Sequence, residues 1–246
     1  MEIPYFEKIS LEEMDNVRLM NRIDHKYWFN SDLLVEILVS IQPHYKILEI
    51  KDKIQQDYIT QYYDTEDNLM YLNHHNGKLN RYKVRKRTYK LSGDSFLEIK
   101  FKNNKSLTSK RRIVTDCDNE NFSLADKQFL LINTPYCAND LHNVLENSFT
   151  RLTLVNKNMQ ERCTIDFNLK MRSDTKSYGF KDLVIVELKI PNKNYQSPLQ
   201  QVLKNHKILS NGFSKYCIGR SVIDENLKTN AFKAKIKQLE ANIYSN

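Results

Sequence analysis

Apolar and charged residues alternate along four segments of the chain, with the period of two expected for β-strands that bury one face. Each segment has an apolar face and a face that carries arginine or lysine with an occasional acid. The charged faces are Arg81, Lys83, Arg85 and Arg87 in residues 80–89, Glu98, Lys100 and Lys102 in FLEIKFK, Arg162, Thr164 and Asp166 in RCTIDFNL, and Glu187 with Lys189 in LVIVELKI. The alternation predicts amphipathic strands at residues 80–89, 95–101, 162–169 and 183–191.

Further elements follow from the same patterns. Strands are expected at residues 22–29, 45–50, 55–63, 109–115 and 148–156, and helical spacing of apolar residues predicts helices at 10–21, 31–41, 124–131, 138–146, 198–209 and 221–243. An Asn76-Gly77 pair indicates a tight turn, so His74 and His75 are expected in an exposed turn. Eight or nine strands with helices mostly at the ends predict an α+β fold, built on an antiparallel sheet that curls or closes.

Composition favours one folded unit. The chain has 246 residues, of which 40% are hydrophobic, and no linker or repeat divides it, so we expect a single domain over residues 1–246. The four scattered cysteines lack C-x-x-C spacing, which argues against a zinc knuckle and indicates reduced thiols. There is no signal-peptide pattern and no apolar stretch long enough to span a bilayer, and we expect a cytoplasmic protein.

The net positive charge limits the chemical classes of binding partner that we expect. A net charge of +8 suits a polyanion, which could be a nucleic acid, an anionic membrane or a phosphorylated small molecule. A charged face on one strand is typically just solvated. Four such faces favour a shared ligand, because a row of cations repels itself and a phosphate chain would relieve that repulsion. The carboxylates among the cations are hard oxygen ligands of the kind that hold Mg²⁺ or Mn²⁺.

Ordered motifs along the chain resemble the VTC domain, the catalytic domain of vacuolar transporter chaperone polyphosphate polymerases, within the triphosphate tunnel metalloenzymes. The motifs are NRIDHKYWF, TQYYDT, YLNHHNGKLNRYKVRKRTY, FLEIKFK, FTRLTL, RCTIDFNL, VIVELKI and FSKYCIG. The resemblance covers about residues 19–219, leaves a C-terminal helix at 221–243, and is closest to the short bacterial form. It implies a closed eight-stranded antiparallel β-barrel with flanking helices, which forms a tunnel for phosphates.

The resemblance also implies residue roles. By motif, the phosphate ligands would be Lys26, Arg85, Arg87, Lys100, Arg151 and Lys215, and Glu187 would hold the metal. Strand parity adds Arg81, Lys83 and Lys189 to the phosphate-binding face and Glu98 as a second metal candidate. The catalytic residues would be Arg85, Arg87, Lys100 and Arg151, which could supply a fixed positive field for phosphoryl transfer.

The chain departs from the fungal pattern at three places. Phe149 and Gly212 stand where that pattern has tyrosine and lysine, and an additional arginine near His74 is missing. Without these residues we still expect phosphate binding, but the case for polymerisation is weaker.

Three functions therefore remain open. The first is a polyphosphate polymerase that uses a nucleotide triphosphate, with ATP as the expected nucleotide and Mn²⁺ or Mg²⁺ as cofactor. The second is a metal-dependent tunnel triphosphatase, and the third is a non-catalytic polyphosphate or nucleic-acid binder. We expect nucleotide triphosphate and polyphosphate as ligands rather than nucleic acid, because charges on several strands imply an enclosed channel. A membrane-protein partner is left open.

The lysines of the last predicted helix are not assigned to the phosphate-binding face. Lys228, Lys233, Lys235 and Lys237 are predicted to form a solvated outer face.

Overall fold

A single curled sheet organises the molecule. The computed structural model describes residues 2–15, 22–105, 107–116 and 121–244. The main path of the sheet runs β2-β11-β9-β8-β4-β5-β6-β7. These strands are β2 (Ile23–Asn30), β11 (Leu183–Ile190), β9 (Arg162–Arg172), β8 (His142–Asn156), β4 (Gln56–Asp64), β5 (Arg81–Tyr89), β6 (Ser95–Lys102) and β7 (Thr108–Val114).

Three short strands extend this path at its sides. β1 (Glu7–Ile9) runs parallel to β3 (Tyr45–Leu48), β3 pairs with β8, and β10 (Ser177–Phe180) pairs with β9. The sheet thus has 11 strands, and all its ladders except β1–β3 are antiparallel.

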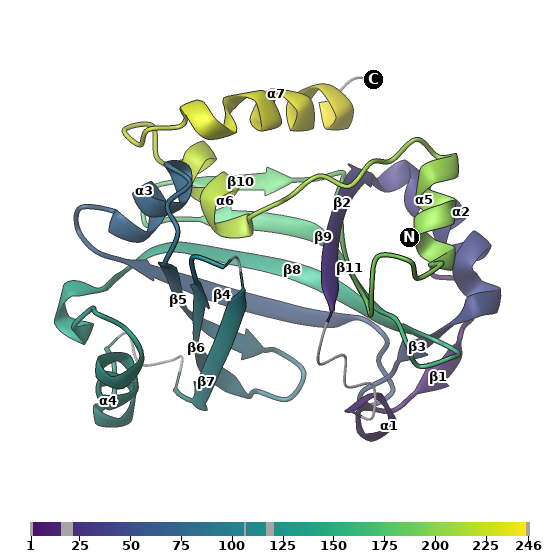
Figure 1. Ribbon diagram of the computed structural model, residues 1–246, viewed down its shortest axis with the longest axis horizontal. Coiled ribbons are helices and arrows are strands. Elements are labelled where there is room, and N and C mark those ends of the chain that lie inside the picture. The colour runs from purple at the N-terminus through teal and green to yellow at the C-terminus, as the bar shows by residue number, and fades with distance from the viewer. Residues whose placement is uncertain (1, 16–21, 106, 117–120, 245–246) are drawn as a thin grey trace.

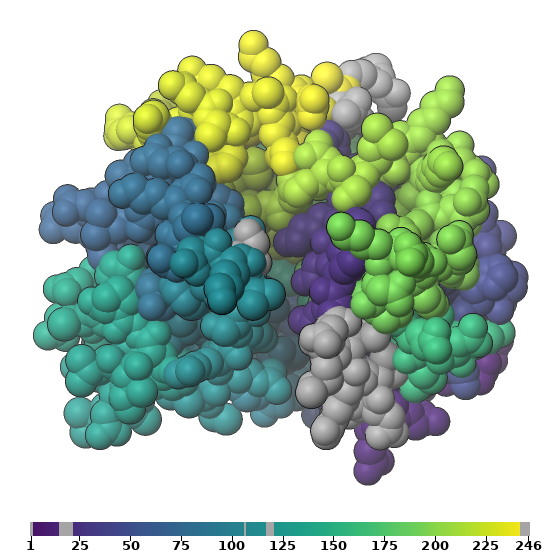
Figure 2. Space-filling view, in the orientation of Figure 1, coloured from purple at the N-terminus to yellow at the C-terminus, as the bar shows by residue number. Residues whose placement is uncertain are grey.

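The sheet curls without closing. Within residues 2–15, 22–105, 107–116 and 121–244 no ladder joins β2 to β7, so the predicted closed eight-stranded barrel is not what the structure shows. The curl nevertheless brings β6 close to β2 and β11. Arg85 and burial have the largest effects on the pKa of Lys100 on β6, but Glu187 on β11 and Lys26 on β2 also shift it. Figure 1 shows β5–β7 and β2 as two walls, with β8 and β9 crossing between them. The result is a trough, and Figure 2 shows the surface hollowed between the two walls.

Helices cover the apolar outer side of the sheet. α2 (Leu34–Ile41) and α5 (Pro198–Asn205) pack on β8, β9 and β11 in a core that includes Leu34, Ile37, Leu152 and Leu199. α4 (Leu124–Asn133) contributes Leu130 to a second core with β5 and β6. The remaining short elements are α1 (Leu11–Asp15) and three 3-10 turns, η1 (Ser31–Leu33), η2 (Gln42–His44) and η3 (Ala138–Asp140).

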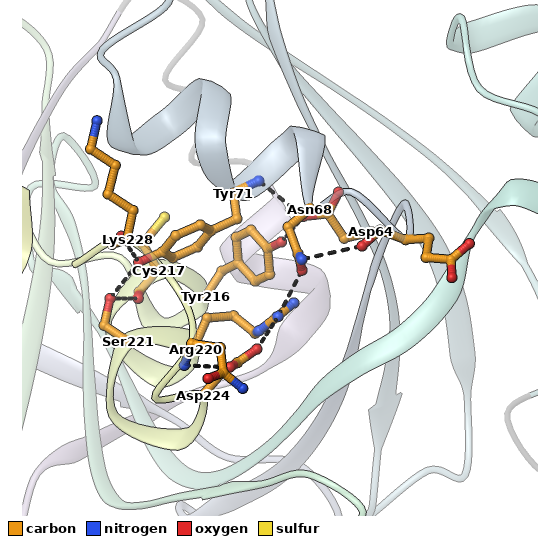
Figure 3. A network of polar contacts seen from close by, with 11 residues as sticks. Asp64, Asn68, Tyr71, Tyr216, Cys217, Arg220, Ser221, Asp224 and Lys228 are labelled. Atoms are coloured by element: carbon orange, nitrogen blue, oxygen red, sulfur yellow. Dashed lines mark hydrogen bonds and ion pairs between the residues drawn. The ribbon is translucent and has the colours of Figure 1, made fainter.

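Three further helices lie at one end of the trough: α3 (Leu69–His75), α6 (Lys215–Ile223) and α7 (Asn230–Tyr244). The buried carboxylate of Asp64 joins the first two. It accepts hydrogen bonds from the backbone N–H groups of Met70 and Tyr71, both at 2.9 Å, and from the hydroxyl of Tyr216 on α6 (Figure 3). Because the first N–H groups of a helix lack intrahelical partners, this acid stabilises the start of α3 while it fixes α6.

Most predicted elements are confirmed to within a few residues, and three are wrong. Residues 138–146 form η3 and the start of β8 instead of a helix, because Leu145 is buried in the core and the segment pairs with β4. The predicted helix at 221–243 is two helices, with α6 ending at Ile223 and α7 beginning at Asn230. His74 and His75 end helix α3 instead of lying in an exposed turn, and His75 is buried. The second half of the predicted helix at 10–21 lies outside the described residues.

The described helices include none that is both long enough and apolar enough to span a membrane.

Candidate functional site

The ladders bring the charged strand faces together on the inner side of the trough. Residues directly opposite each other in an antiparallel ladder point to the same face. The opposed pairs are Arg81 and Lys102, Lys83 and Lys100, Arg85 and Glu98, Lys26 and Glu187, Arg151 and Asp166, and Lys189 and Arg162. The predicted phosphate-binding residues that lie on strands therefore share one concave surface, as strand parity indicated. Their role in binding stays a prediction.

One cluster on this surface is built around Asp166. Nε of Arg151 donates to one carboxylate oxygen at 2.5 Å, and Nη2 donates to the other at 2.7 Å. Lys215, the first residue of α6, forms an ion pair with the same carboxylate and lies 4.3 Å from the ring centroid of Phe149. Burial raises the pKa of Asp166, but the charges of Arg151 and Lys215 outweigh it and hold that pKa well below its usual range. Asp166 is thus a buried counter-ion that positions two cations.

A second cluster is built around Glu98, whose side chain is fully buried. Arg85 donates to Oε2 from Nη2 at 2.6 Å and from Nε at 2.7 Å, and Lys110 forms an ion pair with Oε1. Burial raises the pKa of Glu98, but the charges of Arg85, Arg87 and Lys110 hold it well below its usual range. The sequence predicted a row of cations that repel one another, and this prediction is wrong at Arg85, which has a carboxylate partner.

Arg87 differs from both clusters. It is 8% exposed, and its Nε donates to Thr60 Oγ1 at 3.3 Å. No carboxylate contacts it in the described part of the chain. Burial, followed by the charge of Arg85, lowers the pKa of Arg87 to about 10. This guanidinium is a buried cation that lacks a contact ion pair.

Lysines line the rest of the surface. The charge of Arg85 and burial lower the pKa of Lys100 to about 6, against the opposing charge of Glu187. Burial lowers the pKa of Lys83 against the opposing effects of Cys217 and Tyr62, and the smaller effects of Lys26 and Arg81 add to the lowering. Groups on β2, β5, β6 and β11 thus act on one another across the trough.

The two predicted metal ligands fit a divalent ion unequally. Glu187 contacts Lys189 at 2.8 Å and keeps part of its carboxylate accessible. Glu98 is fully buried and already contacted by two cations, so a metal ion there would have to displace them. No group of three or more His, Cys, Asp or Glu side chains that could hold a metal occurs among the described residues. Glu187 therefore fits only a metal held mainly by phosphates, a mode that Mg²⁺ often adopts, and the geometry disfavours Glu98.

The structure adds inner-face residues that sequence reasoning missed. Asn147 is 1% exposed, and neither atom of its amide has a hydrogen-bond partner within the described chain. It lies opposite Thr60, the residue that holds Arg87. The hydroxyl of Thr164 is likewise buried without a partner in the described ranges. The signal for Asn147 was the period of two continued backward from Arg151, but the strand was predicted to begin only at residue 148.

A curled antiparallel sheet with arginine, lysine and a few carboxylates on its concave face defines an α+β protein with a basic trough. Within that class the chain belongs to the VTC domain family, whose pattern matches residues 21–223. No curated protein matches the chain by sequence.

Two solved structures share the fold. A candidate adenylate cyclase from Bacillus halodurans is 11% identical, with a TM-score of 0.55 over 79% of this chain and 94% of that one. A candidate adenylyl cyclase from Hippeastrum, described as having a dominant triphosphatase activity, is 14% identical, with a TM-score of 0.52 over 82% and 96% of the two chains. At these identities the likeness establishes the fold and nothing finer.

Proposed function

We propose that this protein binds the phosphates of a nucleotide triphosphate along the concave face of the trough and transfers the terminal phosphoryl group to a polyphosphate chain. The observation that carries the proposal is the excess of cations over carboxylates on one buried, concave surface. Lys26, Lys83, Arg87 and Lys100 form no contact ion pair with any described carboxylate. Arg87 is buried and the three lysines are partly buried, so their lack of a carboxylate partner is costly, and a phosphate chain would supply the missing negative charge.

Phosphoryl transfer suits this arrangement because it needs positioning and neutralisation more than covalent chemistry from the protein. Arg85 and Arg151 are held by two hydrogen bonds each to buried carboxylates, so their charges are fixed before the ligand arrives. Their partner acids position them and do not need to contact the substrate. Arg87 and Lys100 would face the phosphate oxygens of the triphosphate directly.

The two buried carboxylates of the site favour a phosphate acceptor over water. A terminal phosphate oxygen is already anionic at neutral pH, whereas water must lose a proton as it attacks. The carboxyl groups of Asp166 and Glu98 are poor general bases, because neighbouring cations hold their pKa values low. In the proposed reaction an oxygen of the chain end forms a bond to the γ-phosphorus, the bond to the β–γ bridging oxygen breaks, and the nucleoside diphosphate leaves with that electron pair.

A divalent ion, when bound, would neutralise charge on the phosphate oxygens. Glu187 is the residue that would hold it, and phosphate oxygens would supply further ligands.

A second candidate is a tunnel triphosphatase. The triphosphatase activity described for the Hippeastrum protein of the same fold favours it, together with the loss of a hydroxyl at Phe149 and a cation at Gly212. Hydrolysis and polymerisation use the same bound triphosphate and differ in the acceptor.

The test is incubation with ATP and either Mn²⁺ or Mg²⁺, followed by a gel for long-chain polyphosphate and an assay for free phosphate. A ladder of products supports the polymerase, and free phosphate alone supports the triphosphatase. The absence of both products would refute an enzymatic role. Arg87→Gln is the informative variant, because it removes a cation without leaving a buried carboxylate unpaired. We expect it to lower turnover about 100-fold, as for other groups that stabilise a transition-state charge. Lys170→Gln, which changes an exposed lysine on β9, is the matched control.

A further inference from the structure

Three lysines from three separate elements hold one short segment at the α7 end of the trough. Nζ of Lys26 on β2 donates to the carbonyl of Phe213 at 3.2 Å, and Nζ of Lys83 on β5 donates to Oγ of Ser214 at 3.1 Å. Nζ of Lys235 on α7 donates to the carbonyl of Gly212. Successive residues of the segment thus each accept a hydrogen bond from a different ammonium group.

The three ammonium groups lack contact ion pairs with any carboxylate that the structure describes. Burial and the charge of Lys26 lower the pKa of Lys235, so the two ammonium groups interact. Glu187 lies opposite Lys26 in the ladder and is itself paired with Lys189. Each ammonium has three donors, and the segment uses one donor of each. This end of the trough therefore holds concentrated positive charge and spare donors.

Helix α7 is placed firmly enough to present Lys235 to this segment. Phe232, Ile236 and Leu239 have the spacing of one helix face and pack against the core shared with Tyr71 and Tyr216. The hydroxyl of Tyr71 donates to the carbonyl of Lys228, just before α7, at 2.9 Å (Figure 3). The predicted solvated face of this helix is confirmed as exposed at Lys233 and Lys237 but is wrong at Lys235, which is half-buried.

We propose that Lys26, Lys83 and Lys235 form a distal anion subsite for a phosphate chain longer than a triphosphate, with Lys235 as its previously unassigned residue. The proposal rests on the proposed function, since it assumes that phosphates also occupy the trough beside Arg87. Lys83 and Arg87 are four residues apart on one strand, which is about 13 Å at 3.3 Å per residue. A longer polyphosphate can occupy the surface beside Arg87 and the distal subsite together, so we expect it to gain more from the distal subsite than a triphosphate does. Lys235 also lies beyond the residues 21–223 that match the family.

The experiment compares two probes, inorganic tripolyphosphate and long-chain polyphosphate, by calorimetric titration at fixed ionic strength. For Lys235→Gln we expect the Kd for long-chain polyphosphate to rise about tenfold or more, since a hydrogen bond to a charged group is lost. The Kd for tripolyphosphate should change by less than about twofold, because that ligand stays near Arg87. Lys235→Arg should retain long-chain affinity, which excludes loss of the fold as the cause.

Lys233→Gln and Lys237→Gln are the matched controls, since each removes the same charge from an exposed position of the same helix. If they weaken long-chain binding as much as Lys235→Gln does, the effect is a general one of net charge and the subsite is refuted. Equal weakening of both probes by Lys235→Gln would also overturn it. If wild-type protein binds neither probe, the proposed function itself fails, and this outcome is distinct from the other two.

Discussion

Replacing Asp166 by asparagine removes the carboxylate that Arg151 and Lys215 share, while it keeps the size of the side chain. Asp166 is 3% exposed, accepts two hydrogen bonds from Arg151 and pairs with Lys215. Breaking a buried ion pair by removing one partner costs about 3–5 kcal/mol, because the remaining charge stays buried without compensation. We expect Asp166→Asn to lower the free energy of unfolding of the ligand-free protein by about that amount.

Tripolyphosphate should restore much of this loss. A ligand that binds only the folded state stabilises it by mass action, by about 2.7 kcal/mol at a concentration 100 times its Kd. Arg151 and Lys215 lie on the proposed phosphate surface, and in the variant the ligand becomes their main source of negative charge. The stabilisation by a given tripolyphosphate concentration should therefore be larger in Asp166→Asn than in the wild type.

The assay is urea unfolding of both proteins with and without tripolyphosphate, at matched ionic strength. The double variant Asp166→Asn with Arg151→Met serves as the control, because it removes one of the orphaned charges and should recover part of the stability. A loss below about 1 kcal/mol would show that water already compensates the pair. An equal or smaller ligand effect in the variant would show that phosphate does not reach Arg151 and Lys215.

Three other changes test separate parts of the site. Glu187→Gln should abolish metal-dependent turnover and weaken Mn²⁺ binding in the presence of tripolyphosphate, yet leave the Kd for metal-free tripolyphosphate within a few-fold; unchanged turnover would place the metal elsewhere. Lys100, with a pKa of about 6, is mostly neutral at pH 8 and should take up close to one proton when phosphate binds, so affinity should fall as pH rises above 6. Titration calorimetry in two buffers of different ionisation enthalpy measures this uptake, which Lys100→Met should eliminate. Burial raises the pKa of Glu161 from an ordinary 4.5 to about 7, against hydrogen bonds from Tyr45 and Ser197 that lower it. The folded state therefore holds the proton more tightly, and stability should decline by about 3 kcal/mol as pH rises from 4.5 to 7; a Glu161→Gln melting series with the same pH slope would contradict this.

Strand parity predicted which residues share the inner face, because the period of two depends only on local geometry. It could not predict their partners. Arg85 and Glu98 meet because β5 and β6 pair in one particular register, and a shift of one residue would separate them. Glu98 therefore looked like a metal ligand in the sequence, whereas its neighbours make it a counter-ion.

The errors in secondary structure have a related cause. The spacing of residues 138–146 predicted a helix, but pairing with β4 and burial of Leu145 make residues 142–146 the start of β8. Because the strand was predicted to begin only at residue 148, Asn147 was left out of it. For the last helix, the sequence showed four lysines but not the fold of the chain between α6 and α7, which directs Lys235 alone toward the trough.

The placement of the carboxylates suggests where a phosphate would sit. On the inner face, Arg85 and Arg151 each have an acid that holds them with two hydrogen bonds. Such pairs keep a basic surface folded without a ligand, although each acid also weakens the attraction for an anion. Arg87 is as buried as Arg85, but it donates to the hydroxyl of Thr60 and lies over the rings of Tyr58 and Phe149, with no described carboxylate in contact. A permanent acid beside Arg87 would compete with the substrate, so its lack of one marks this guanidinium as the position where the ligand itself completes the ion pair.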